Sequence, residues 1–236
     1  KKIFQPTGST ISAVLFDMDG VLIDSIPLHL EAWAIAFNRK KLPCFTNEFY
    51  FSMLGCKNSD LLDEHLKKFD VRMSGHERKA FLSGKEGVFR KIVESKGKVT
   101  PGVKEWLNYF RENEIRCAVA SSGNMFNIVN VLWALDLSEF FTSILSAATL
   151  PFGKPNPEVF QLAAASLGAN PVECLVIEDA LAGIEAAHAA GMSCLAIATS
   201  YAREDLKMAD MVLDSLSEKN PEEIFFIKKE ENITCY

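Results

Sequence analysis

From residue 103 onward, the chain alternates between short apolar segments and amphipathic segments of about ten residues. Apolar runs that lie between helical patterns are typical of parallel strands that helices bury on both faces. The expected strands are 115–120, 143–145, 173–177, 193–197 and 211–213, and the expected helices are 103–111, 125–135, 157–167 and 180–190. The alternation predicts an α/β fold with a Rossmann-like parallel sheet and helices on both of its faces.

One earlier segment, 13–16, has the same apolar character and ends at the sequence DMDG. We assign it to the same sheet. The residues that follow it read differently, because 27–40 repeats apolar side chains every three or four positions. Residues 46–96 are more charged and contain no strand-like run. The chain therefore inserts an all-helical segment after its first strand.

This insertion predicts two domains. Residues 1–24 and 99–236 are expected to form the α/β core domain, and residues 25–98 the helical cap domain. A domain joined by two connections can open and close, so the connections near 23–26 and 96–101 are expected to act as hinges.

The composition limits the partners that the chain can have. Its 25 Lys and Arg residues are outnumbered by 31 Asp and Glu residues, which gives a formal net charge of −6. No basic excess is available to neutralise nucleic-acid phosphates, so no nucleic-acid partner is expected. No apolar run approaches the roughly 20 residues that cross a bilayer, so no membrane partner is expected either.

The cysteines favour a reducing compartment. None of the six has the CxxC spacing typical of zinc sites, and several lie in apolar segments, where a reduced buried thiol is expected. The expected location is the cytoplasm. Import into an organelle stays open, because the sequence starts at Lys1 rather than at a methionine and a removed targeting peptide would not be visible. The oligomeric state also stays open, with a slight preference for a monomer.

Polar side chains that can do chemistry follow the expected strands. Asp17 and Asp19 follow the first strand, SSGN at 121–124 follows the second, and Glu178-Asp179 follows 173–177. Ligands of open α/β sheets bind beyond the carboxyl ends of the strands, so these side chains are expected to meet there. Lys154, in a loop between two prolines, is expected at the same edge.

Each of these residues also has an ordinary interpretation. Asp19-Gly20 can form a turn, Ser122 and Asp179 can cap helices, and a loop lysine such as Lys154 is usually solvated. Their combination, however, indicates phosphoryl transfer. Carboxylate oxygens suit Mg²⁺, and a carboxylate can attack phosphorus while a second acid moves the proton. A lysine, a serine and backbone N–H groups can stabilise the transferring phosphoryl group.

Four segments resemble the four successive motifs of the haloacid dehalogenase superfamily: DMDGVLIDS, VASSGN, GKPNPEVF and IEDALAGIEAAHAAGM. The helical insertion is similar to the small cap of the β-phosphoglucomutase-like phosphatase branch. The resemblance implies a haloacid dehalogenase-like core with a helical cap. It also implies hydrolase chemistry with Mg²⁺ as the cofactor.

Residue by residue, the resemblance implies Asp17 as the nucleophile that becomes aspartyl-phosphate and Asp19 as the general acid/base. The implied metal ligands are Asp17, the backbone carbonyl of Asp19 and Asp179, with Glu178 supporting the metal shell. The implied phosphate-binding residues are Ser121, Ser122 and Lys154. A dehalogenase proper lacks an acid two residues after the nucleophile, so Asp19 favours phosphate chemistry.

The cap is expected to select the substrate. His29 lies twelve residues after Asp17, where β-phosphoglucomutase has a cap histidine, but it can equally be a partly exposed polar residue of the helix 27–40. Lys85 resembles the cap lysine that faces the active site in this branch, or it is an ordinary surface lysine. Asn58 and Asn124 stand where that mutase has an arginine and a lysine.

Because a mutase must hold a bisphosphate, the loss of these two cations favours hydrolysis. The sequence therefore predicts a Mg²⁺-dependent phosphatase acting on a small phosphorylated metabolite, such as a sugar phosphate, whose identity stays open. Two alternatives remain: a β-phosphoglucomutase-type phosphosugar mutase, and a non-catalytic module that binds a small molecule or a protein.

Overall fold

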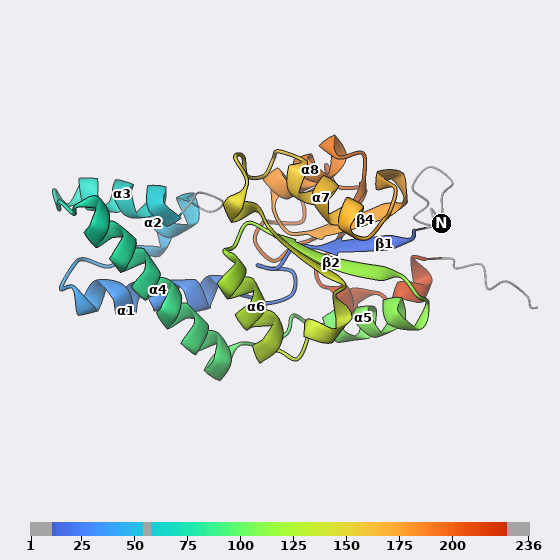
Figure 1. The fold of residues 1–236 in the computed structure, drawn as a ribbon, viewed down its shortest axis with the longest axis horizontal. Helices are drawn as coiled ribbons and strands as arrows, with labels where there is room; N and C mark the ends of the chain where they lie inside the picture. Colours follow the sequence, from blue (N-terminus) through green and yellow to red (C-terminus); the bar gives the residue numbers. More distant parts are fainter. Residues whose placement is uncertain (1–10, 54–57, 226–236) are drawn as a thin grey trace, which may run out of the picture.

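The computed structural model describes residues 11–53 and 58–225. Its centre is a six-stranded parallel sheet with the order β3-β2-β1-β4-β5-β6 (Figure 1). The strands are β1 (Ala13–Phe16), β2 (Arg116–Ser121), β3 (Ser143–Ser146), β4 (Cys174–Glu178), β5 (Ser193–Ile197) and β6 (Met211–Leu213). The parallel α/β sheet predicted from the sequence is confirmed. Since β1 pairs with both β2 and β4, the first strand lies in the middle of the sheet.

Helices cover both faces of this sheet (Figure 1). They are α5 (Val103–Glu112) and α6 (Met125–Ala134) on one face, and α7 (Glu158–Ser166) and α8 (Leu181–Ala189) on the other. Alternate residues of β1 point to opposite faces, so Val14 and Phe16 pack with α5 and α6, while Ala13 and Leu15 pack with α7 and α8. This two-sided burial explains why the strands are continuous apolar runs.

The inserted segment is helical, as predicted. Its helices, which lie together beside one edge of the core in Figure 1, are α1 (Ile26–Arg39), α2 (Asn47–Ser52), α3 (Asn58–Lys68) and α4 (Gly75–Lys96). An aromatic cluster that includes Trp33, Phe37 and Phe81 fills the space between them. Ser74 and Glu77 form a reciprocal capping box that begins α4, and Gly97 follows its last turn. The fold is thus an α/β core with a helical cap.

The two connections between cap and core lie side by side. Ile23 and Val99 form an antiparallel bridge, and the Thr100 N–H donates to the Leu22 carbonyl at 3.0 Å. Their pairing is consistent with a common hinge, although the hinge itself and the domain bounds 1–24, 25–98 and 99–236 stay predictions. Parts of these domains, residues 1–10, 54–57 and 226–236, lie outside the described residues.

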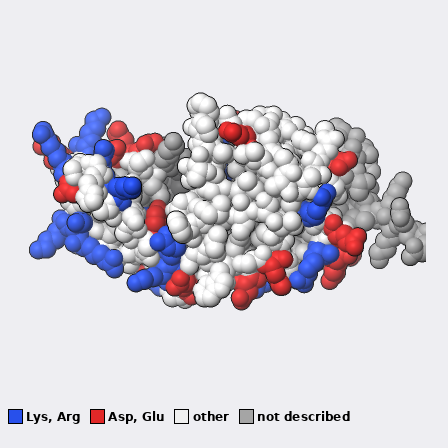
Figure 2. Space-filling model, in the orientation of Figure 1, with Lys and Arg blue, Asp and Glu red and all other residues white. Residues whose placement is uncertain are grey.

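Short 3₁₀ turns complete the described chain: η1 (Ser138–Phe140), η2 (Ala147–Thr149), η3 (Pro171–Glu173), η4 (Leu216–Glu218) and η5 (Pro221–Glu223). None of the described helices combines the length and the apolar character of a membrane span. Figure 2 shows charged side chains gathered on the cap and along one edge of the core, while the middle of this face is almost uncharged. The helix α6 carries no charged residue and exposes the side chains of Phe126, Val129 and Trp133.

Candidate active site

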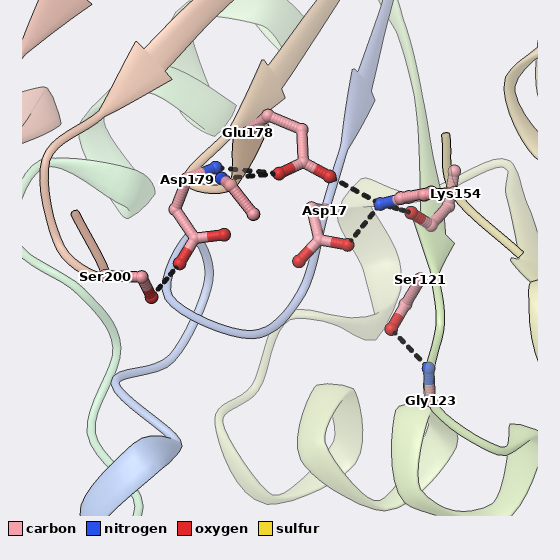
Figure 3. Close-up of polar contacts among 9 residues, drawn as sticks. Asp17, Ser121, Gly123, Lys154, Glu178, Asp179 and Ser200 are labelled. Atoms are coloured by element: carbon pink, nitrogen blue, oxygen red, sulfur yellow. Dashed lines mark hydrogen bonds and ion pairs between the residues drawn. The ribbon is translucent and has the colours of Figure 1, made fainter. Parts of the chain in front are cut away.

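Lys154 joins two carboxylates beyond the end of the central strand (Figure 3). Its Nζ lies 2.6 Å from Asp17 Oδ1, 2.6 Å from Glu178 Oε1 and 3.1 Å from the carbonyl oxygen of Ala120. Asp17 follows β1, Glu178 ends β4, and Lys154 comes from the loop between β3 and α7. All three side chains are buried, with exposed fractions of 9% or less. Lys154 therefore contacts carboxylates that are 137 and 24 positions away from it in the sequence.

The acids at this edge outnumber the one lysine that contacts them. Burial raises the pKa of Asp17 to about 7, although Lys154 acts against this rise, and the nearby carboxylates Glu178 and Asp19 add to it. Burial also raises the pKa of Asp179 well above its ordinary value, and the carboxylates of Glu178 and Asp17 contribute. Burial by itself would lower the pKa of Lys154, but its carboxylate partners outweigh burial and raise it. Lys154 is thus a permanent cation within an excess of negative charge.

Two hydroxyl groups lie on one side of the Asp179 carboxylate. Ser200 Oγ donates to Asp179 Oδ2 (Figure 3). Thr199 Oγ1 lies 3.4 Å from the same oxygen. Thr199 Oγ1 also contacts the Gly20 carbonyl oxygen at 2.7 Å. Every hydrogen bond that the described residues make to the Asp179 carboxylate ends on Oδ2. The other oxygen, Oδ1, is therefore the one left for a further ligand.

Gly20 allows this close approach. Its φ of +77° lies in the left-handed region, and a Cβ at this position would lie 1.9 Å from Asp179 Oδ2. The turn interpretation of Asp19-Gly20 is thus correct for the backbone. It is compatible with a chemical role, because the turn places the loop after β1 against the Asp179 carboxylate.

Our sequence reasoning missed Thr199 and Ser200. Both follow β5. Side chains that bind ligands are expected beyond the carboxyl ends of the strands, so the same expectation applied to the segment 193–197 would have found them. The helix-cap interpretation of Asp179 is wrong, because Ala180 is the N-cap residue of α8 and no side chain caps this helix.

Glu178 is turned toward Lys154 rather than outward. Its Oε2 accepts the backbone N–H groups of Asp179 at 2.9 Å and Ala180 at 3.0 Å, while Oε1 contacts Lys154. Gly183 of α8 makes room for it, since a Cβ there would lie 2.0 Å from Glu178 Oε1. Glu178 thus accepts backbone N–H groups with one carboxylate oxygen and contacts Lys154 with the other.

The segment after β2 provides a buried hydroxyl. Ser121 is fully buried, and its Oγ accepts the Gly123 N–H at 3.0 Å, which leaves its own O–H free to donate to a ligand. Ser122 is exposed, and none of the described hydrogen bonds joins it to Asp17 or Lys154. Asn124, and not Ser122, caps α6, because Asn124 Oδ1 accepts the Asn127 N–H at 3.0 Å.

On the cap side, Asp19 faces a histidine and a lysine. His29 Nε2 lies 3.8 Å from Asp19 Oδ1, and the His29 ring stacks on Phe89. Lys85 Nζ lies 2.9 Å from His29 Nδ1 and 4.9 Å from the centre of the Trp33 ring. Because Lys85 can only donate, Nδ1 accepts and the proton of neutral His29 lies on Nε2, which faces Asp19.

Electrostatics support this assignment. Burial lowers the pKa of His29, and the Lys85 ammonium lowers it further. Burial by itself would raise the pKa of Asp19, but neighbouring His29, Ser25 and Lys85 outweigh burial and lower it. The surface interpretation of Lys85 is wrong, because none of its side chain is exposed. His29 is partly exposed, as its alternative interpretation expected, with 17% of its side chain exposed, and it also faces Asp19.

None of the described contacts joins Asn58 to Asp19. Its Nδ2 instead donates to Glu86 Oε1 at 2.7 Å, and Glu86 also pairs with Lys85 at 3.1 Å. Our sequence reasoning missed Glu86, which has no distinguishing local pattern. Within residues 11–53 and 58–225, no group of three His, Cys, Asp or Glu side chains forms a ready metal site on its own.

Comparisons with known proteins agree with this architecture. The model of the haloacid dehalogenase-like hydrolase family matches residues 11–191. The chain is 30% identical over 205 residues to validoxylamine A 7'-phosphate phosphatase of Streptomyces hygroscopicus subsp. limoneus, covering 86% of this chain and 93% of that protein. It is also 30% identical over 222 residues to hexitol phosphatase B of Escherichia coli K12, covering 90% and 96%.

A solved structure shows the same fold. The crystal structure of β-phosphoglucomutase from Clostridium difficile superposes with a TM-score of 0.77 at 29% sequence identity, covering 90% of this chain and 95% of that chain.

Proposed function

The chain belongs to the haloacid dehalogenase-like hydrolase family, and we propose that it is a Mg²⁺-dependent phosphatase of small phosphate monoesters. Sugar phosphates or similar metabolites are the proposed substrates, as the names of the phosphatase relatives suggest. The observation that carries the proposal is the buried Lys154 ammonium, 2.6 Å from both Asp17 and Glu178. This contact holds a carboxylate nucleophile beside a cation that can bind phosphate.

The residues at this edge fit a divalent cation. Asp17 and Asp179 are buried with more negative charge than Lys154 neutralises, and Asp179 Oδ1 is left for a ligand. Mg²⁺ is bound through one or two carboxylates plus water and substrate oxygens, so three converging side chains are not required. Asp17, Asp179 and the Asp19 carbonyl would hold it, and bound Mg²⁺ would supply charge stabilisation for the phosphoryl oxygens.

In the proposed first step, a carboxylate oxygen of Asp17 attacks phosphorus and the ester P–O bond breaks. Asp19 gives its proton to the leaving oxygen, so the products are the free alcohol and the Asp17 acyl phosphate. In the protein without substrate the pKa of Asp19 is lowered. The negative charge of a bound phosphate raises this pKa and so favours the protonated carboxyl group. Lys154 and the Ser121 hydroxyl stabilise the phosphoryl oxygens during transfer.

In the second step, Asp19 takes a proton from water as the water oxygen attacks phosphorus. The bond between phosphorus and the Asp17 oxygen breaks, which restores the carboxylate and releases inorganic phosphate. His29 Nε2 lies 3.8 Å from Asp19 Oδ1, so this imidazole lies beside the acid in both steps.

The function is tested by measuring phosphate release from a panel of phosphorylated sugars, polyols, nucleotides and small acids, with Mg²⁺ and with EDTA. We expect Mg²⁺-dependent release from at least one sugar or polyol phosphate. Absence of release from every member of the panel would contradict the proposal.

A mutase is the second candidate, because a β-phosphoglucomutase is among the structural neighbours. Asn124 is engaged as a helix cap and Asn58 as a donor to Glu86, so neither offers a cation for a second phosphate. With β-glucose 1-phosphate and a bisphosphate primer, a mutase forms glucose 6-phosphate. We expect glucose and inorganic phosphate instead.

The hydroxyl groups on Asp179 lead to a prediction about metal affinity. Ser200→Ala removes one of the donors that hold Asp179 Oδ2, so the carboxylate loses its fixed orientation. We expect Mg²⁺ affinity, measured by isothermal titration of the metal-free protein, to fall about tenfold, as is typical when a partner of a metal ligand is removed. Ser193→Ala, at the opposite end of β5, is the matched control and should leave the affinity unchanged. Equal affinities in all three proteins would show that Ser200 does not position Asp179.

A further inference from the structure

Glu86 is the carboxylate at the junction of cap and core, and three donors surround it. Its Oε1 accepts from Lys85 Nζ at 3.1 Å and Asn58 Nδ2 at 2.7 Å, and its Oε2 accepts from Asn127 Nδ2 at 2.6 Å. Asn127 belongs to the core helix α6, whereas the other two donors belong to the cap. Only 12% of the Glu86 side chain is exposed. Glu86 is thus fixed in place.

A continuous row of contacts connects Glu86 to the acid that faces the leaving group. Lys85 Nζ contacts Glu86 on one side and His29 Nδ1 at 2.9 Å on the other. His29 Nε2 then faces Asp19 Oδ1 at 3.8 Å. In the proposed mechanism Asp19 must touch the leaving oxygen, so the rest of the leaving group lies beside this row of side chains.

The positive charge of Lys85 is already balanced by a carboxylate before a substrate binds. Lys85 is completely buried, and no other lysine or arginine of the described residues is buried as deeply. An unpaired buried ammonium would attract a second phosphate, but here the Glu86 carboxylate is its partner. Arg90, on the same helix α4, donates from its guanidinium to the Asn127 amide oxygen at 2.9 Å and has no described contact with Glu86 or His29. Among the described residues, this row therefore offers hydrogen-bonding groups to the leaving group without a net positive charge.

We propose that Glu86 is a specificity-determining residue that restricts the substrate to monophosphates with an uncharged, hydroxylated leaving group. Its carboxylate repels a second phosphate directly. It also pairs with the buried Lys85 ammonium, which would otherwise bind a second phosphate. This inference rests on the proposed phosphatase function and adds the class of leaving group to it. Sugar and polyol monophosphates fit such a site, and sugar bisphosphates do not.

The test compares phosphate release from glucose 6-phosphate and from glucose 1,6-bisphosphate. In the wild-type protein we expect kcat/KM to favour the monophosphate. In Glu86→Gln, which keeps the shape of the side chain and removes its charge, we expect the ratio to move about tenfold toward the bisphosphate, the effect of one nearby partly screened charge. Glu86→Asp keeps the charge and should retain the wild-type preference.

Glu94→Gln is the matched control. Glu94 lies on the same helix α4 and its Oε1 likewise accepts from a core asparagine, Asn130 Nδ2, at 2.8 Å. It has no described contact with Lys85. Removing its charge should therefore leave the preference between the two substrates unchanged, and thermal melting checks that each variant is folded.

Isothermal titration of the same two compounds into an Asp17→Asn background measures the preference as affinity, without turnover. A wild-type protein that prefers the bisphosphate, or equal changes for both compounds in Glu86→Gln, would overturn the role of Glu86. Failure of wild-type protein to release phosphate from any compound would instead contradict the phosphatase function. In that case the affinities still decide whether Glu86 discriminates.

Discussion

Asp17→Asn is expected to lower Mg²⁺-dependent phosphate release by at least about 10⁴-fold, because an amide oxygen is a poor nucleophile and removing a covalent catalyst has effects of this size or larger. The amide that replaces the carboxylate would keep an oxygen near Lys154, so the loss should come from chemistry rather than from misfolding. Release of phosphate from the best substrate of the panel, with thermal melting as the check on folding, measures this effect.

Asp24→Asn is the control for this first prediction. Asp24 lies in the same loop after β1 but is exposed. Its replacement changes the net charge by the same amount and should leave turnover unchanged. Rapid acid quenching during turnover should also trap a phosphoryl group on Asp17 in the wild-type protein. Turnover by Asp17→Asn near the wild-type rate would contradict the nucleophile assignment.

Asp19→Asn is expected to lower turnover of a sugar or polyol phosphate by about 10²–10⁴-fold, the usual contribution of general acid/base catalysis. The proposed metal contact of Asp19 is its backbone carbonyl, so Mg²⁺ affinity should stay near that of the wild type. The leaving alcohol of a sugar phosphate needs a proton, whereas p-nitrophenolate leaves without one.

p-Nitrophenyl phosphate is therefore the control substrate for Asp19→Asn. The burst of p-nitrophenol that accompanies phosphorylation of Asp17 should survive in Asp19→Asn, while hydrolysis of the acyl phosphate should slow. An equal loss of both steps, or a large loss of Mg²⁺ affinity, would indicate that Asp19 acts on the metal rather than on the proton.

The elements of the fold could be predicted from the sequence because each depends on local patterns. The apolar runs and the helical spacing located every strand of the sheet and the helical insertion. The order of the strands could not be predicted in this way. It places β1 between β2 and β4, strands that follow it by about 100 and 160 residues, and such pairings are decided by packing of the whole domain.

The candidate site could likewise be predicted only in part. Asp17, Ser121 and the pair Glu178-Asp179 were found because they follow strands, and the carboxyl ends of parallel strands share one edge of the sheet. Local sequence does not reveal which carboxylate Lys154 contacts, or that Glu86 faces Asn127 from 41 positions away. These are tertiary contacts between side chains, and a pattern of residue types does not specify their partners.

The helices α1 and α4 each contribute to two hydrophobic clusters at once. Leu28 and Ala32 of α1, with Val88 and Phe89 of α4, belong to the cluster on the sheet face that α5 and α6 cover. Trp33 and Phe37, the next turn of α1, and Phe81 of α4 belong to the aromatic cluster of the cap. Neither cluster can lose its packing without exposing apolar surface on a helix that the other one needs. Heat or denaturant should therefore unfold the cap and the sheet in a single cooperative transition, although ligand-linked hinge motion remains compatible with it.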